Sequence, residues 1–140
     1  MTYLDSAILV KLYTQEPDSE QWRNWVSPRS DLVTSSLALP EVRSALRQKV
    51  MLGFLKPRQQ NIVWREFQRA TQAGIIRVFP VGSDVVDQAV NILEQMPRIL
   101  PLRALDALHL ATAQLIHASV LATTDQRMRA GAQEIGLPLA

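Results

Sequence analysis

The chain has 140 residues, which fits one domain over residues 1–140 and is long enough to bury a sizeable core. Hydrophobic residues make up 47% and charged residues 20%, a globular composition that excludes disordered, collagen-like and coiled-coil proteins. Cysteine is absent and only two histidines occur, which excludes disulfides, thiol catalysis, iron–sulfur clusters and the usual zinc sites. Any metal bound here would be a hard cation held by oxygen.

The charge and the apolar runs indicate a water-soluble chain without a clear nucleic-acid signature. The formal net charge is +2, and a solvated surface explains it most simply, although twelve of the fifteen basic residues are arginine, a good phosphate ligand. The N-terminus has no basic region ahead of an apolar core, so no signal peptide is predicted. The longest apolar stretch, residues 105–124, contains Asp106 and His109, so no membrane span is predicted. We expect a soluble cytoplasmic protein.

Short β-like runs alternate with longer helical segments, a pattern typical of an α/β fold with a parallel sheet. The first half of the chain predicts, in order, a strand at Thr2–Leu4, a helix at Ala7–Thr14 capped by Ser6, and a short helix opened by Pro17. A second strand at Leu32–Thr34 precedes a helix that runs through Glu41 to about Val50. Gly53 and Pro57 then interrupt a helical hairpin whose second helix ends near Thr71, with an inner face made of Ile62, Phe67 and Ala70.

The second half predicts a third strand at Ile75–Phe79 and a helix at Asp84–Met96 capped by Ser83. The helix at Leu105–Ile116 is apolar on nearly every face, so we expect it at the centre of the molecule. A fourth strand at Val120–Thr123 and a helix at Asp125–Ile135 follow, with a short edge strand at Leu137–Leu139. The predicted architecture is a three-layer α/β/α domain with four to five parallel strands.

Four of the thirteen carboxylates stand among apolar neighbours: Asp5, Glu41, Asp106 and Asp125. Asp5 and Asp125 directly follow predicted strands, at the carboxyl edge where open parallel sheets bind ligands. Glu41 lies in the first turns of the helix that leaves the second strand. Asp106 opens a helix that runs antiparallel to the strands, so its first turn lies on the same side. Each acid alone is equally well explained as a helix cap or a solvated loop residue.

As a set, the four acids predict a metal site. Carboxylates that converge without a cation repel one another and raise at least one pKa, whereas Mg²⁺ or Mn²⁺ accepts carboxylate oxygens and retains water. One or two such ions can deprotonate a water and hold a scissile phosphate. This pattern indicates phosphodiester hydrolysis without a His or Cys nucleophile.

At these residues the sequence resembles the PIN-domain ribonucleases, in particular the VapC-like toxins of bacterial toxin–antitoxin pairs. The matching segments are Tyr-Leu-Asp-Ser-Ala at Asp5, Ser-Ser-Leu-Ala-Leu-Pro-Glu-Val at Glu41, Leu-Arg-Ala-Leu-Asp-Ala-Leu-His-Leu-Ala at Asp106 and Ala-Thr-Thr-Asp-Gln-Arg-Met at Asp125. The resemblance covers the whole chain and keeps the order of the acids. Pro40 beside Glu41 is less usual for the family.

The resemblance implies a Mg²⁺- or Mn²⁺-dependent endoribonuclease toxin that hydrolyses RNA, is inhibited by a cognate antitoxin and forms a homodimer. It places the metal and catalytic role on Asp5, Glu41, Asp106 and Asp125. Asp5 and Asp106 are expected to be the primary ligands, Asp125 a supporting one, and Glu41 a ligand or the base for the attacking water. Hydroxyls that support such a site match Ser6, Ser35 and Thr124.

Other side chains have two interpretations each. His109 shares a helix face with Asp106 and either touches a substrate phosphate or, more commonly, is fixed by a neighbour. The tryptophans either stack on RNA bases or pack in the core or a partner interface, and a helical context favours packing: Trp22, Trp25 and Trp64. Arginines on the helical hairpin form either a basic lip for RNA or a solvated face: Arg43, Arg47, Arg65 and Arg69. We expect the antitoxin to cover this hairpin, residues 39–71.

Two rival functions remain open at this stage. A DNA-directed nuclease of the flap type would use the same chemistry, but the chain is short for the extra DNA-clamping elements. A receiver-like Mg²⁺-binding signalling domain expects paired acids after the first strand and a lysine near the last, whereas Asp5 is unpaired and no lysine follows Lys56. The RNA target, the number of metal ions and the preferred metal are not encoded in any pattern.

Overall fold

The computed structural model describes all residues from Met1 to Ala140 and contains four strands and seven helices. The strands are β1 (Thr2–Leu4), β2 (Leu32–Ser35), β3 (Ile76–Phe79) and β4 (Val120–Ala122). The first four helices are α1 (Ser6–Tyr13), α2 (Ser19–Val26), α3 (Ala38–Met51) and α4 (Pro57–Gln72). The last three are α5 (Ser83–Gln95), α6 (Ala104–Leu115) and α7 (Gln126–Glu134).

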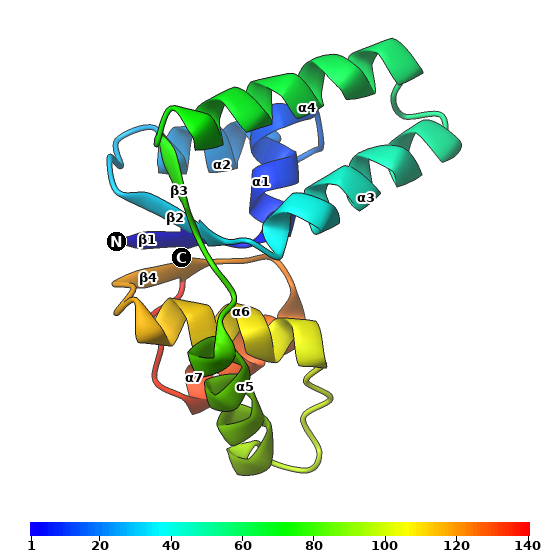
Figure 1. The fold of residues 1–140 in the computed structure, drawn as a ribbon. Helices are drawn as coiled ribbons and strands as arrows, with labels where there is room; N and C mark the ends of the chain where they lie inside the picture. The colour runs from blue at the N-terminus through cyan, green and yellow to red at the C-terminus, as the bar shows by residue number, and fades with distance from the viewer.

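The strands form one parallel sheet in the order β3-β2-β1-β4. Helices α1 to α4 lie on one face of this sheet and α5 to α7 on the other (Figure 1). The three-layer α/β/α prediction is therefore confirmed with four strands. The expected edge strand at Leu137–Leu139 is reduced to a single parallel bridge between Leu121 and Leu139.

Strand alternation explains why the domain has two cores. In β1, Tyr3 points into the core beneath α5 to α7, whereas the next residue, Leu4, points into the core beneath α1 to α4. Both side chains are fully buried, so β1 lies between two helical layers. A parallel sheet covered on both faces leaves mainly its edges and ends accessible to ligands.

Three local expectations are wrong. The N-cap of α1 is Asp5, not Ser6, because the Asp5 carboxylate accepts the Ile8 N–H. Helix α5 begins at Ser83, after Gly82 as N-cap, so Ser83 is not the cap. Ile62 is 47% exposed, although it was expected to be inward.

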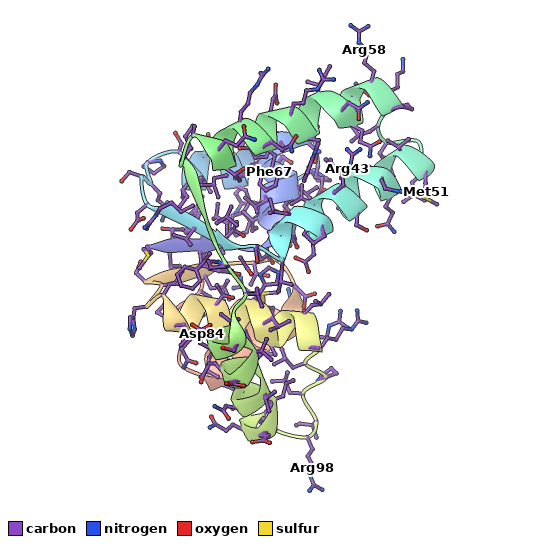
Figure 2. All side chains as sticks on the ribbon, viewed as in Figure 1. Arg43, Met51, Arg58, Phe67, Asp84 and Arg98 are labelled. Atoms are coloured by element: carbon purple, nitrogen blue, oxygen red, sulfur yellow. The ribbon has the colours of Figure 1, made fainter.

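The exposure of Ile62 follows from the shape of the α3–α4 hairpin. Its far end extends beyond the sheet, and Figure 2 shows Met51 and Arg58 at that end. Phe67 lies nearer the sheet, is fully buried and contacts the ring of Tyr13, with ring centroids 5.8 Å apart. The sheet-proximal half of the hairpin therefore packs on the core, and the far half does not.

Helix α6 is central, as expected: seven of its residues are buried, among them Asp106 and His109. It runs antiparallel to β4, so its first turn lies at the carboxyl ends of the strands, as do the starts of α1 and α3 on the opposite face (Figure 1). The carboxyl edge of the sheet is therefore where the four candidate acids lie.

None of the seven helices combines the length and the apolar composition that a membrane span requires.

Candidate active site

Asp5 is a buried carboxylate at the end of β1. Only 2% of the residue is exposed, and Oδ1 accepts the Ile8 N–H at 2.8 Å. Burial raises the pKa of Asp5, and the Glu41 charge adds to the rise; the Thr123 hydroxyl, the Ile8 N–H and His109 act in the opposite direction but do not outweigh burial. No lysine or arginine forms an ion pair with this carboxylate. Asp5 is therefore a poorly compensated negative group.

Glu41 lies in the first turn of α3 and reaches towards α6. Its Oε2 is 2.7 Å from Nε2 of His109, and 24% of its side chain remains exposed. Burial raises the pKa of Glu41, but the hydrogen bond and charge of His109 and the hydroxyl of Ser6 together lower it below its ordinary value. Glu41 is therefore an ionised carboxylate held from two sides, with part of its surface open to solvent.

His109 is 1% exposed and both its ring nitrogens have partners. Nδ1 is 2.6 Å from the hydroxyl of Tyr3, which is itself fully buried in β1. Of the two interpretations of His109, the structure shows the one in which neighbours fix it. The role of Tyr3 was missed, since a tyrosine inside a buried strand looks like a core residue in sequence.

Asp106 and Asp125 each bind the backbone of their own helix start. Asp106 is 8% exposed, and its Oδ2 accepts the N–H of Arg103 at 3.0 Å. Asp125 is the N-cap of α7, and its Oδ1 accepts the N–H groups of Arg127 and Met128 at 2.8 and 3.1 Å. Both carboxylates retain an oxygen that makes no hydrogen bond in the structure.

Of the four acids, Glu41 contacts His109 directly, and the charge of Glu41 adds to the rise in the pKa of Asp5. Asp106 lies one turn before His109 on α6, and Asp125 follows β4. No group of three or more His, Asp or Glu side chains is arranged to hold a metal ion. The donor set nevertheless suits a hard cation, because the buried Asp5 carboxylate has no cationic partner and the other acids offer oxygen only.

The hydroxyls predicted to support the site are placed differently from one another. The Ser6 hydroxyl helps to lower the pKa of Glu41, and Ser35 is buried, with its oxygen accepting the Leu37 N–H at 3.2 Å. The hydroxyl that acts on Asp5 belongs to Thr123, not to Thr124. Thr124 lines a neighbouring groove of about 380 Å³ between α1 and α3. A larger cavity of about 490 Å³ is lined mainly by apolar side chains and holds no acid.

The aromatic and basic candidates lie mainly in the packing of the helical layer. All three tryptophans are half-buried against the core beneath α1 to α4: Trp22, Trp25 and Trp64. Arg43 lies over Trp64, 5.5 Å from the ring centroid, so it is not a free phosphate ligand, whereas the other hairpin arginines are exposed: Arg47, Arg65 and Arg69. The packing interpretation thus holds for the tryptophans, whereas the exposure of the three arginines agrees with both a basic lip and a solvated face.

Comparison with known proteins identifies the family of the chain. The PIN domain family matches residues 2–133. Ribonuclease VapC46 of Mycobacterium tuberculosis is 34% identical over 96% of this chain and 92% of its own length. Ribonuclease VapC47 of the same species is 30% identical over 100% of this chain and 96% of its own length.

Solved structures share the fold at lower identity. FitAcB from Neisseria gonorrhoeae superposes with a TM-score of 0.76 at 18% identity, covering 99% of this chain and 96% of that one. VapC20 of Mycobacterium tuberculosis, described as a toxin that cleaves the sarcin-ricin loop, gives 0.74 at 15% identity over 93% and 94%. The receiver-like alternative is thereby rejected. The chain belongs to the PIN-domain family, among the VapC-type ribonucleases.

Proposed function

We propose that this protein is a metal-dependent endoribonuclease that acts as the toxin of a toxin–antitoxin pair. The observation that carries the proposal is Asp5, a buried carboxylate without a cationic partner at the carboxyl edge of the sheet, next to the ionised Glu41. A site that keeps such a charge uncompensated is built to receive a cation. The relatives named ribonucleases supply the reaction class.

The residues that would hold Mg²⁺ or Mn²⁺ are the four carboxylates: Asp5, Asp106, Asp125 and Glu41. Bound there, the ion would lower the pKa of a water and neutralise charge on the scissile phosphate. Asp5 and Asp106 are the more buried pair, which suits primary ligands. Asp125 is already engaged by two backbone N–H groups, which suits a supporting ligand.

Asp5 and Glu41 have different tasks in the proposed reaction. The N–H of Ile8 binds Oδ1 of Asp5 and fixes the side-chain rotamer, so the other oxygen is already oriented before a ligand binds. Glu41 is ionised and partly exposed, so it can accept a proton from an attacking water or bind the ion. The exposed arginines of the hairpin attract the RNA backbone over the nearby surface.

RNA cleavage by the purified chain tests the proposal. Single-stranded and structured RNAs, with a DNA of matching sequence, are incubated with EDTA and then with Mg²⁺ or Mn²⁺ restored. We expect cleavage of RNA only, and only after metal is restored. Preferential cleavage of DNA would favour the flap-type alternative, and equal RNA cleavage in EDTA would contradict the proposed dependence on a metal ion.

We propose that the antitoxin binds along the α3–α4 hairpin and the adjacent groove. Apolar side chains are strongly exposed at the hairpin tip: Met51 at 80%, Phe54 at 73% and Leu52 at 63%. Leu52 and Phe54 also line the groove that reaches Thr124, beside the acids. An apolar segment of the partner would fill this groove, and a cationic side chain would extend into the acidic site. Solved relatives include a toxin–antitoxin complex from Klebsiella pneumoniae, with a TM-score of 0.65.

Co-expression with the product of the neighbouring reading frame tests this interface. Phe54→Ser is expected to weaken the complex at least tenfold, a loss of about 1.4 kcal/mol, because an exposed aromatic anchor is removed without disturbing the core. Trp64→Ala should also weaken it, with some loss of stability because Trp64 packs on Phe67, 5.7 Å between centroids. Unchanged affinity in both variants would reject the interface.

We also propose a homodimer that acts in the cytoplasm, where its RNA substrate is found. Three apolar residues one turn apart form an exposed stripe on α5: Val86 at 46%, Val90 at 48% and Leu93 at 37%. A two-fold pairing of this stripe would cover it. Light scattering on the wild type and on Val90→Asp measures the outcome: a dimer and a monomer, respectively. A wild-type monomer at high concentration would exclude the homodimer.

A further inference from the structure

Three residues from three elements form one hydrogen-bonded chain beside the acids. Tyr3 comes from β1, His109 from α6 and Glu41 from α3. The Tyr3 hydroxyl is 2.6 Å from Nδ1 of His109, and Nε2 of His109 is 2.7 Å from Oε2 of Glu41. The two rings meet edge to face, with centroids 5.9 Å apart and planes at 76°. The chain ends on Glu41, a candidate acid whose side chain remains partly exposed.

The groups at the two ends of this hydrogen-bonded chain determine which ring nitrogen of His109 donates to Glu41. A carboxylate oxygen accepts, so in the 2.7 Å contact with Oε2 of Glu41 the donor is the N–H at Nε2 of His109. The Tyr3 hydroxyl, 2.6 Å away, is the partner of the other ring nitrogen, Nδ1. The two contacts therefore fix the orientation of the imidazole ring between β1 and α3.

We propose that His109 is a positioning residue of the ribonuclease site: held by Tyr3, it donates from Nε2 to Glu41 and fixes the orientation of that carboxylate. This inference rests on the proposed function. It assigns a task to two residues, Tyr3 and His109, that lie behind the acids and do not touch the substrate.

The physical need for such a device comes from the length of the glutamate side chain. A free Glu has several accessible rotamers, and fixing one costs up to about 2 kcal/mol of side-chain entropy. The contact with His109 holds Glu41 from the opposite helical layer before any ligand arrives. Groups behind metal ligands that orient them in this way typically contribute about 10–100-fold in metal affinity or activity.

A matched pair of variants separates positioning from packing. In His109→Gln the side-chain amide nitrogen lies near the original Nε2, so it can still donate to Glu41. In His109→Asn the shorter amide stays near the original Nδ1 and does not reach Glu41. If His109 positions Glu41, Asn should reduce Mn²⁺ affinity in the absence of RNA, and kcat, by about tenfold or more, while Gln retains most of both. Equal losses in the two variants would overturn the proposal.

The tautomer itself is measurable without any activity. Nitrogen-15 labelling of histidine gives two imidazoles, and His117→Asn identifies the second, since His117 is exposed and Asn tolerates its positive φ of 53°. We expect a hydrogen on Nε2 of His109 in the wild type, and a changed Nδ1 signal in Tyr3→Phe. A wild-type His109 without a hydrogen on Nε2 would overturn the proposal. Absence of RNA cleavage together with the expected tautomer would reject the proposed function and leave the hydrogen-bonded chain intact.

Discussion

Two clusters of charged side chains lie along helices α1 and α3, and only one of them contains cations. The acidic rim consists of Asp5, Glu41, Asp106 and Asp125. The lysine cluster consists of Lys11, Glu16, Asp18 and Lys49, in which Lys11 is 2.6 Å from Glu16 and 2.7 Å from Asp18, and Lys49 is 2.7 Å from Glu16. In the lysine cluster every carboxylate has an ammonium partner, whereas in the acidic rim Asp5 has none.

The pKa values follow this difference. Burial raises the pKa of Glu16, but the two lysines outweigh it and lower the value below the ordinary one; the lysine contact likewise lowers the pKa of Asp18. Burial raises the pKa of Asp5, and no lysine reverses the shift. Lysines of α1 and α3 therefore neutralise nearby carboxylates, whereas no lysine of either helix reaches Asp5, which makes the unneutralised Asp5 a functional feature.

The largest expected effect is on catalysis. Asp5→Asn and Asp106→Asn keep the side-chain shape and remove the charge that would hold the metal, so each should abolish RNA cleavage, a loss of at least about 100-fold. Glu16→Gln is the matched control, since it removes a carboxylate of the same helical layer from the lysine cluster, and it should retain activity. Initial rates with Mn²⁺ in excess measure all three. Full activity of the Asp5→Asn protein would show that the rim is not the site.

A smaller loss is expected for Asp125→Asn. Its carboxylate is committed to the N–H groups of Arg127 and Met128, and an asparagine oxygen can accept the same bonds. The variant should retain its fold and lose about tenfold in rate, equivalent to 1.4 kcal/mol. A loss as complete as that of Asp5→Asn would place Asp125 among the primary ligands instead.

The smallest effects are on stability and have opposite signs in the two clusters. The folded-state pKa of Asp5 is raised, so its contribution to stability falls as pH rises from the ordinary aspartate value to the raised one. Near neutral pH and in EDTA, Asp5→Asn should therefore be more stable than the wild type, on the order of 1 kcal/mol. At about pH 3 the carboxyl is protonated in both the folded and the unfolded state, so the gain should vanish.

Glu16 behaves in the reverse sense. Its folded-state pKa is lowered, so its stabilising effect is present above the ordinary glutamate value and is lost as pH falls through the lowered one. Because the group is largely screened by solvent, Glu16→Gln should cost only about 0.5 kcal/mol near neutral pH and nothing in acid. Urea unfolding of both variants at the two pH values gives the comparison; two shifts of the same sign near neutral pH would refute the contrast between the clusters.

The fold was predictable because strand ends and helix starts are visible in sequence as changes of hydrophobic period. The four acids were singled out by their apolar neighbours and by the family motifs. The hydrogen-bond partners of those acids could not be predicted. Tyr3 is separated from His109 by 106 positions and His109 from Glu41 by 68, and nothing local marks such contacts. The same holds for the cap of α1, where Asp5 and Ser6 are both good capping residues and only the three-dimensional path selects Asp5.

The exposure of the far end of the hairpin could not be predicted from the sequence either. Ile62 has the spacing of an inward residue, but α4 extends past the sheet, so no core lies beneath that position. Periodicity identifies the apolar face of a helix and not the length over which a core covers it. The tip residues exposed by this geometry are the ones assigned above to the antitoxin.

Calorimetric titration of Mn²⁺ into the wild type, Asp5→Asn and Glu16→Gln, without RNA, tests most directly whether the uncompensated rim is a cation site. Wild type and Glu16→Gln should bind Mn²⁺ with similar affinity, while Asp5→Asn should bind at least about tenfold more weakly, a difference of 1.4 kcal/mol. Equal binding by all three proteins, or no binding by the wild type, would contradict the assignment of Asp5 and its neighbours as the metal site.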